Sequence, residues 1–402
     1  MKQLRLRAVF MRGGTSKALM FRASDLPAER DLWAPIFLGA IGSPDPNGRQ
    51  LDGMGGGISS LSKVCVIGPP TRDGADVDYT FAQVSVKDEA VDYSGNCGNM
   101  SSAVGPFAVD EGLVTAGDAA GEATVRIHNT NTHKLIVAHF LLDGGRAAVD
   151  GDFKLPGVAG SGAPVRLDFL EPGGAGTGRL LPTGNPADVL DIDGAEIEVS
   201  MVDAANPCVF VSAEALGTNG IEMPEELEAN GELLRRLDAI RIAASLRMGI
   251  AKTAEAAARI PSIPKVAMVA PARAARTLAG ERLAAGEADV TVRMISIGQP
   301  HRAVPLTGAM CLAVASRIEG TVVNRLARPS GSPDDPVRIA QPSGLTVVGA
   351  AVGRAIDRGR DAWFAERATV YRTARRLMEG WVFVGAAALP ENLRSALAAA
   401  RR

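Results

Sequence analysis

Short β-rich segments separated by glycine-rich turns fill most of the first half of this chain, whereas helical patterns are few. Alternation and β-branched content predict strands over residues 5–10, 63–67, 77–86, 124–128, 135–142 and 165–169. Apolar periodicity predicts helices over about 29–41, 101–113, 224–248, 307–318 and 365–378. Many strands around few helices favour an α+β fold over a doubly wound parallel sheet.

A sequence pattern that occurs twice suggests that the chain has two similar halves. In each half, strands lead into a polar turn that contains glycine, and an apolar helix of small residues follows. The two turns are Asn96-Cys97-Gly98-Asn99 and Pro305-Leu306-Thr307-Gly308. The glycine- and proline-rich stretch 171–185 is the expected linker. The repeated pattern therefore predicts two helix N-termini that face each other across a domain cleft.

Composition excludes several classes of partner. Lysine plus arginine (43) nearly balances aspartate plus glutamate (45), so the formal charge of −2 does not favour nucleic acid or a membrane surface. No apolar stretch reaches membrane-spanning length, and no signal-peptide core follows the first residues. The four cysteines include no CxxC pair, which favours a reducing cytoplasm over a disulfide framework.

Cys97 is the strongest candidate for chemistry. It lies among glycine and asparagine at the start of an expected helix. Unpaired N–H groups and the positive end of the helix dipole favour a thiolate there. The same N–H groups can hold a carboxylate or an enolate oxygen. Cys65, Cys208 and Cys311 have apolar neighbours instead and are interpreted as small buried hydrophobes.

Lys63 opens a strand after the turn 52–62, which is rich in glycine and serine. Such turns let the backbone approach a ligand closely. A desolvated lysine at the rim of the turn can act as a general base. A solvated lysine at a strand end is the alternative, and the pattern does not decide between the two.

Three further segments contain groups of the kind that bind a carboxylate. The segment Arg12-Gly13-Gly14-Thr15-Ser16-Lys17 is typical of an anion loop, and a plain hairpin turn explains it equally well. It is not a P-loop, and Gly53-Met54-Gly55 lacks the third glycine of a dinucleotide fingerprint. His301 precedes the second turn, where a satisfied loop histidine is the favoured alternative, and Asn206 follows an expected strand. The four histidines lack metal-ligand spacing, so we expect neither a metal nor a cofactor.

These motifs make the chain similar to the family of 2-methylaconitate cis–trans isomerases, which also contains 3-methylitaconate and 4-oxalomesaconate Δ-isomerases. The resemblance covers nearly the whole chain and is carried by residues 11–17, 42–46, 49–56, 62–64, 94–99, 182–185 and 377–381. It implies a diaminopimelate-epimerase-like fold, in which two similar domains each wrap a curved sheet around a central helix. The active site would lie between them. The last strand, 381–384, would return to the first domain, so the expected domains are 1–184 with about 378–402, and 185–377.

The resemblance assigns catalysis to Lys63 and Cys97. Epimerases of this fold use two cysteines, but residues 305–309 include none, so a lysine–cysteine pair fits better. The implied reaction is a cofactor-independent 1,3-allylic proton shift, or an equivalent cis–trans change, in an unsaturated di- or tricarboxylate. Lys63 is the expected base and Cys97 the expected acid, and the reverse stays open. The expected substrate-binding residues are Arg12, Gly13, Gly14, Thr15, Ser16, Ser60, Asn96, Gly98, Asn99, Asn206, His301, Thr307, Gly308 and Ala309.

Alternatives stay open for the substrate and for the class of protein. The best candidate substrate is 2-methylaconitate, with 4-oxalomesaconate and 3-methylitaconate as alternatives. An amino-acid epimerase, or a non-catalytic accessory protein that binds a tricarboxylate, also stays open. The expected partner is a small molecule rather than nucleic acid or membrane. The sequence does not fix the oligomeric state, so a homo-oligomer stays open.

Overall fold

The computed structural model describes residues 3–115, 117, 121–296, 298–332, 335–355, 362–386, 389–391 and 394. The chain forms two compact units, Met1–Leu167 with Tyr371–Arg402 (unit 1) and Asp168–Val370 (unit 2). These boundaries fall inside strands β9 (Val165–Leu170) and β20 (Ala362–Arg372). The sequence placed them at 184/185 and at about 377/378.

The stretch 171–185, expected as a linker, belongs to unit 2. The backbone N–H groups of Gly176 and Thr177 donate to Asp203 Oδ2 at 2.8 and 2.7 Å. Thr177 Oγ1 donates to the same oxygen at 2.8 Å. A buried carboxylate therefore ties this glycine-rich segment to its own unit.

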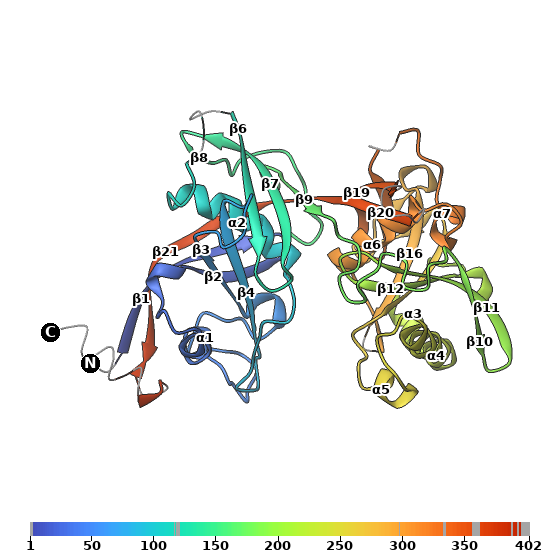
Figure 1. Ribbon diagram of the computed structural model, residues 1–402, viewed down its shortest axis with the longest axis horizontal. Helices are drawn as coiled ribbons and strands as arrows, with labels where there is room; N and C mark the ends of the chain where they lie inside the picture. Colours follow the sequence, from blue (N-terminus) through green and yellow to red (C-terminus); the bar gives the residue numbers. More distant parts are fainter. Residues whose placement is uncertain are drawn as a thin grey trace. The chain divides into compact units, whose positions relative to one another are not determined.

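Unit 1 is a mixed sheet wrapped around helix α2 (Figure 1). Its elements are β1 (Gln3–Gly13), β2 (Ser16–Arg22), α1 (Trp33–Ile41), β3 (Lys63–Gly68), β4 (Val77–Val84), β5 (Val91–Asp92), α2 (Gly98–Asp110), β6 (Gly121–Asn129), β7 (Lys134–Asp143), β8 (Arg146–Ala147) and β21 (Ala374–Gly385). The strand order is β21–β1–β2–β3–β4–β6–β7. The pairs β2–β3 and β4–β6 are parallel, and the other pairs in this order are antiparallel.

The two faces of this sheet pack against different helices. Val64 and Val66 of β3 join Phe37 of α1 in one apolar cluster. Because successive strand residues point to opposite faces, Lys63 and Cys65 lie on the other face, toward α2. The alternation along β3 thus places the expected catalytic lysine beside the central helix.

Glu111 fixes the C-terminal end of α2 inside the sheet. Its buried carboxylate accepts hydrogen bonds from Arg22 Nε and Arg376 Nη1, each at 2.9 Å, and pairs with Arg7. The three arginines come from β2, β21 and β1. Burial alone would raise the pKa of Glu111, but the hydrogen bonds and charges of Arg7 and Arg376 bring it below the ordinary value.

Replacing Glu111 with glutamine is expected to lower the free energy of unfolding by about 1–3 kcal/mol at pH 7, because the buried carboxylate loses its charge while Arg7 and Arg22 stay partly exposed to water. The folded-state pKa of Glu111 is lowered, so this stabilisation is present above the unfolded value of 4.5 and is lost as the pH falls further. Urea unfolding of both proteins at pH 7 and at acidic pH measures the difference. Glu379→Gln removes an exposed partner of Arg376 and serves as the control. Equal losses in the two variants would show that Glu111 stabilises no more than a surface ion pair does.

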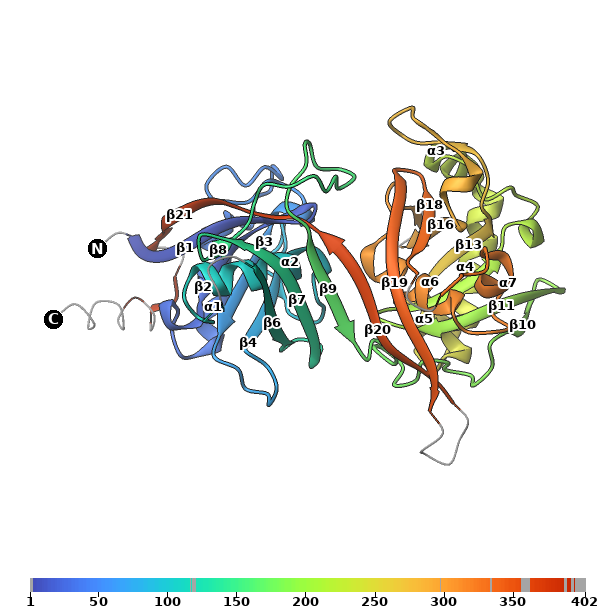
Figure 2. The ribbon, with the colours of Figure 1, turned by 90° about the horizontal axis from the view of Figure 1, so that it is seen from above.

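The strands of unit 2 pair in the same order and directions as those of unit 1. Helix α6 lies among them as α2 does in unit 1 (Figure 2). The elements of unit 2 are β10 (Asp188–Ile192), β11 (Ala195–Asp203), β12 (Pro207–Ser212), α3 (Pro224–Ala229), α4 (Gly231–Arg247), α5 (Ala254–Ala258), β13 (Lys265–Pro271), β14 (Ala275–Arg276), β15 (Arg282–Leu283), β16 (Val290–Ser296), β17 (Gln299–Pro300), α6 (Leu306–Ser316), α7 (Val322–Leu326), β18 (Val337–Gln341) and β19 (Gly344–Ala355). The order is β10–β11–β12–β13–β16–β18–β19, with β12–β13 and β16–β18 parallel. Helix α4 packs on the face away from α6.

The expected α+β class is confirmed, but two expected helices differ from the structure. The helix expected over 365–378 is wrong, because strands β20 and β21 occupy this region. Burial alternates along β20, where Ala368 and Val370 are buried between more exposed neighbours, so packing overrides helix-favouring composition. The helix expected over 224–248 is broken at Asn230, whose side chain accepts from the N–H of Leu233 at 3.0 Å and caps α4. Within the described part of the chain, no helix combines the length and apolarity needed to cross a membrane.

Candidate active site

Cys97 is the N-cap residue of α2, which begins three residues earlier than the sequence predicts. Its side chain is half-buried, and no side chain caps this end of the helix. The first intrahelical hydrogen bond runs from the N–H of Ser101 to the Cys97 carbonyl at 2.9 Å. The N–H groups before it, which include those of Gly98 and Asn99, therefore have no acceptor within the helix. They are available to an anionic oxygen.

Asn96 is held in place beside this helix end. Its Oδ1 accepts from Asn129 Nδ2 at 3.2 Å and from Ser101 Oγ at 3.3 Å. Asn129 is fully buried, and its own Oδ1 accepts from the N–H and the hydroxyl of Thr132. These contacts occupy the amide oxygen of Asn96, so its Nδ2 is the group that it can offer to a ligand.

Lys63 is buried, with 7% of its surface exposed, which contradicts the alternative of a solvated lysine. Its Nζ donates to Gln83 Oε1 on the neighbouring strand and lies 5.0 Å from the ring centre of Phe81. Gln83 Nε2 donates to the carbonyls of Ser62 and Ser59 at 2.9 and 3.0 Å, which fixes the orientation of the amide. No carboxylate among the described residues pairs with Lys63. It is a desolvated amine with a neutral hydrogen-bond partner.

Cys65 links Lys63 and Cys97 electrostatically. Burial raises the pKa of the Cys65 thiol, the charge of Cys97 raises it further, and Lys63 lowers it. Both groups therefore lie within electrostatic range of the same sulfur, which is itself 3.9 Å from Tyr79 Oη. The two expected catalytic side chains share one neighbourhood inside unit 1.

The segment 12–17 forms the hairpin turn between β1 and β2, with Gly13 opposite Ser16. A β-carbon on Gly13 would lie 2.7 Å from the carbonyl oxygen of Asn99, and one on Gly14 would lie 2.3 Å from Asn99 Oδ1. The two glycines therefore let the hairpin pack against the first turn of α2. Arg12 Nη1 donates to the carbonyls of Gly14 and Thr373 at 3.0 and 2.9 Å, so this nitrogen serves the hairpin itself.

The remaining expected residues of unit 1 are Thr15, Ser16 and Ser60. Thr15 is exposed at the tip of the hairpin, and its Oγ1 accepts from Asn99 Nδ2 at 3.1 Å. Ser16 is buried at the start of β2. Ser60 lies in the 3-10 turn Ser59–Leu61, which Ser62 separates from Lys63. Asn99 thus connects the hairpin with the start of α2.

In unit 2 three of the expected residues lie at the start of α6. Its N-cap is Pro305, and no side chain caps the helix; Thr307, Gly308 and Ala309 form its first turn. A β-carbon on Gly308 would lie 2.4 Å from Met294 Sδ, so this turn packs tightly on β16. Asn206 lies between β11 and β12, and its Nδ2 donates to the carbonyl of the adjacent Pro207 at 2.8 Å.

His301 is not the satisfied loop histidine that the sequence favours. Its backbone N–H donates to the Met294 carbonyl at 2.8 Å, but Nε2 of its ring is buried without a hydrogen-bond partner. Burial, together with the charge of Lys265, lowers the pKa of His301 to about 4. The imidazole is therefore neutral at pH 7.

The chain is similar to known proteins over nearly its whole length. The family model described as "PrpF protein" matches residues 3–385. The chain belongs to the PrpF family. The 3-methylitaconate isomerase of Eubacterium barkeri is 42% identical over 389 residues, which cover 96% of this chain and 99% of that protein. The 2-methyl-aconitate isomerase of Shewanella oneidensis is 39% identical over 392 residues, with 95% and 97% covered. The crystal structure of methylitaconate-delta-isomerase has a TM-score of 0.88 and 41% identity, and the match covers 97% of this chain and 98% of that one. This PrpF-family chain is accordingly an isomerase.

Arg372 was not expected from the sequence, yet its side chain contacts the candidate site through Asn99. Its Nε donates to Asn99 Oδ1 at 3.1 Å and its Nη1 to the Tyr371 carbonyl at 2.8 Å. Burial lowers the pKa of Arg372 to about 10, and no carboxylate in the described ranges pairs with it. Buried and exposed residues alternate along β20, which indicates a strand that ends at Arg372, but residues 365–378 were interpreted as a helix.

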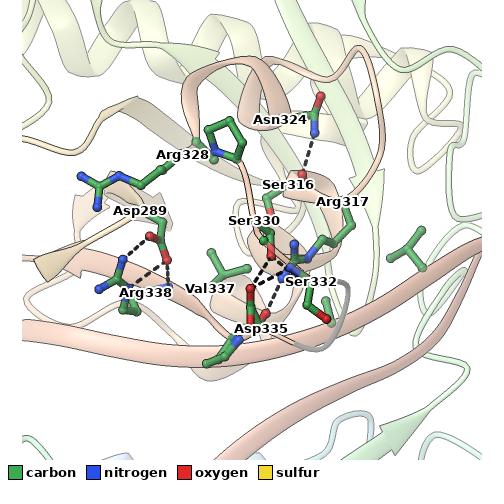
Figure 3. Close-up of a pocket in the computed structure, with 16 residues that line it drawn as sticks. Asp289, Ser316, Arg317, Asn324, Arg328, Ser330, Ser332, Asp335, Val337 and Arg338 are labelled. Atoms are coloured by element: carbon green, nitrogen blue, oxygen red, sulfur yellow. Dashed lines mark hydrogen bonds and ion pairs between the residues drawn. The ribbon is translucent and has the colours of Figure 1, made fainter. Parts of the chain in front are cut away.

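Two cavities lie away from the lysine–cysteine pair of the PrpF-family chain. The larger, of about 680 Å³, lies in unit 2, where Arg338 pairs with Asp289 at 2.6 Å and Arg317 donates to the Asp335 carbonyl (Figure 3). These charged side chains of the cavity are thus paired with other groups of the protein. The smaller, of about 230 Å³, lies in unit 1 and is lined by Arg12 and Arg375 among others. Burial and the charge of Arg375 lower the pKa of Arg12.

Proposed function

We propose that this chain is a cofactor-independent isomerase that moves a proton within the allylic unit of an unsaturated di- or tricarboxylate. The supporting observation is that Lys63 is buried on the face of β3 toward α2, and that Cys97 stands at the uncapped N-terminal end of the same helix. An amine and a thiol can exchange protons with carbon, and free N–H groups can stabilise the anion formed between the two transfers. The isomerase relatives support the same class of reaction.

The proposed reaction conserves atoms and electrons. Lys63, as the neutral amine, takes a proton from the carbon next to the double bond. The electrons of that C–H bond form a new double bond, and the former double bond delocalises its electrons onto a carboxylate as a dienolate. Cys97 then gives its proton to the far carbon, and the two side chains return to their starting states by proton exchange. A cis–trans change uses the same dienolate, because the former double bond has gained single-bond character and can rotate.

The N–H groups at the start of α2 are the proposed site of the dienolate oxygen. One such donor contributes roughly 10²–10³-fold to kcat in enzymes that stabilise an oxyanion. Asn99 and Thr15 are proposed to bind a substrate carboxylate, with Arg372 orienting the Asn99 amide. The first turn of α6, over Thr307, Gly308 and Ala309, is the proposed counterpart in unit 2. The four free thiols support the reducing cytoplasm as the compartment.

A proton NMR screen in deuterated buffer tests this function. The substrates are 2-methylaconitate, 3-methylitaconate, 4-oxalomesaconate and cis-aconitate, and the signals followed are those of vinyl, methyl and methylene protons. We expect deuterium incorporation at the allylic carbons of 2-methylaconitate. A cis–trans change would shift the methyl and methylene signals, whereas migration of the double bond would add a vinyl signal. Exchange at the α-carbon of amino acids without double-bond migration would identify an epimerase instead. Binding of every substrate without exchange would identify an accessory protein.

A further inference from the structure

Gln83 of β4 stands directly opposite Lys63 of β3 in the sheet of unit 1. Val64 and Ala82, their neighbours on the two strands, pack on the face toward α1. Lys63 and Gln83 therefore share the other face, toward α2. The Lys63 amine donates a hydrogen bond to Gln83 Oε1, and the ring centre of Phe81 is 5.0 Å from the same nitrogen. An uncharged oxygen thus faces the amine that the proposed reaction uses.

The Gln83 amide has one orientation that satisfies its hydrogen bonds. Its Nε2 donates to the carbonyls of Ser62 and Ser59 at 2.9 and 3.0 Å. The reversed amide would turn its oxygen toward these two carbonyl oxygens, which lose both hydrogen bonds and leave acceptors facing each other. Oε1 of Gln83 is therefore fixed toward Lys63 Nζ.

The glycine- and serine-rich turn 52–62 holds the two carbonyls in place. Gln50 lies two residues before the turn with 1% of its surface exposed, and its Oε1 accepts from Ser62 Oγ at 2.7 Å and from the N–H of Gly57 at 2.9 Å. A β-carbon on Gly57, whose φ is +74°, would lie 2.3 Å from the Gly48 carbonyl oxygen. The turn thus packs against its own backbone, and Gln50 ties its last residue to it. The motif therefore fixes the carbonyls that hold the amide facing Lys63.

The other titratable groups around Lys63 are two thiols and a phenol. Cys65 lies on the same strand, Tyr79 on β4, and Cys97 at the start of α2. Burial raises the pKa of Cys65 and of Tyr79, so both stay uncharged at pH 7. No carboxylate of the described ranges forms an ion pair with Lys63. Its fixed partner is an amide oxygen, which accepts from the amine and from the ammonium alike, whereas a carboxylate would favour the ammonium.

Unit 2 has no such amide beside its corresponding lysine. Lys265 opens β13 as Lys63 opens β3, and each of these strands runs parallel to its predecessor. The side-chain partner of Lys265 is Ser296, whose Oγ accepts from Nζ at 3.2 Å. A serine hydroxyl rotates and can donate as well as accept, so it does not fix one direction. The central helix of unit 2 also has Pro305 at the N-cap instead of Cys97, so the fixed amide occurs in the unit that carries the thiol.

We propose that Gln83 is a positioning residue for the proton transfer. Its fixed oxygen takes one hydrogen of the Lys63 amine and so limits the directions of the lone pair, without a charge that would keep the amine protonated. The inference rests on the proposed function, since it takes Lys63 as the group that accepts a proton from carbon. A base that is held in the reactive orientation transfers the proton faster than one that samples several.

Gln83→Glu separates this role from a structural one, because it keeps the shape of the side chain and places a carboxylate on the amine. The carboxylate favours the ammonium, so the neutral base forms only at higher pH. We expect the rising limb of kcat/KM against pH to move up by about one pH unit or more. Activity above that limb is expected to recover in part. A merely structural role would lower the rate by the same factor at every pH and leave the limb in place.

Gln83→Met removes the acceptor and keeps the length of the side chain. We expect kcat to fall about 10–100-fold, because the amine loses its fixed orientation. KM is expected to stay within about threefold, because Gln83 acts through Lys63 and not on the substrate. Proton NMR on the acid that wild type isomerises measures both variants, and thermal unfolding verifies the fold. Should Gln83→Met fail to fold, Gln83→Glu carries the test alone, since its readout is the position of the limb.

Gln3→Met and Gln3→Glu are the matched controls, because they change an exposed glutamine of β1 in the same unit. They are expected to keep the kcat, the KM and the pH limb of wild type. A folded Gln83→Met protein with the kcat of Gln3→Met, or a Gln83→Glu limb that coincides with that of Gln3→Glu, would overturn the proposal. Failure of the proposed function looks different, because wild type itself would then exchange no allylic proton with any of the acids.

Discussion

Cys97→Ala is expected to lower kcat/KM for allylic isomerisation by about 10³–10⁴-fold, at the upper end of what a positioned acid or base contributes. The half-buried side chain caps no N–H group, so its removal leaves α2 and its helix end in place. Conversion of 2-methylaconitate followed by proton NMR measures the rate, and thermal unfolding verifies the fold. Cys311→Ala removes a buried thiol from α6 and is expected to retain activity within about threefold, because it leaves the proton-transfer groups untouched. A folded Cys97→Ala protein with the wild-type rate would remove Cys97 from the mechanism.

Lys63→Met is expected to lower kcat/KM by a factor similar to that for Cys97→Ala, because no other amine lies on the same face of β3. Methionine retains the length and apolar stem of the side chain. Lys63→Arg is also expected to be inactive, since a guanidinium stays protonated and cannot accept a proton from carbon. The matched control is Lys87→Met, which removes an exposed lysine of the same unit. Activity in Lys63→Arg would show that the positive charge, and not proton transfer, is what position 63 supplies.

The same two variants assign the acid and the base. A protein that keeps its base still exchanges the allylic proton with deuterated water, even where it cannot complete the isomerisation. We therefore expect residual exchange at the starting carbon in Cys97→Ala and none in Lys63→Met. Exchange in Lys63→Met alone would reverse the two roles.

The sequence predicted the features that depend on local chemistry. Cys97 was found because polar glycine-containing turns start helices, and Lys63 because strand alternation begins at it. The burial of Cys65, Cys208 and Cys311 is confirmed for the same reason, since their neighbours are apolar. The repeat of topology was also visible, because both copies carry a similar turn before a small-residue helix.

The features that the sequence did not predict depend on long-range pairing. Gly13 and Gly14 were interpreted as an anion loop or a plain hairpin, but their packing against Asn99 is set by a residue more than 80 positions away. Arg372 was missed because helix-favouring composition hid the alternation of β20, whose partner strand is set by the sheet. Lys265 resembles an ordinary strand-end lysine until the order of strands aligns it with Lys63.

The unequal chemistry of the two repeats has an evolutionary consequence. A gene that holds two copies of one scaffold can vary the copy that has proline at the N-cap of its central helix while selection preserves the copy that has cysteine there. Exchange of the segment around α6 between relatives would then transfer preference for one acid over another, and the turnover chemistry would be inherited unaltered.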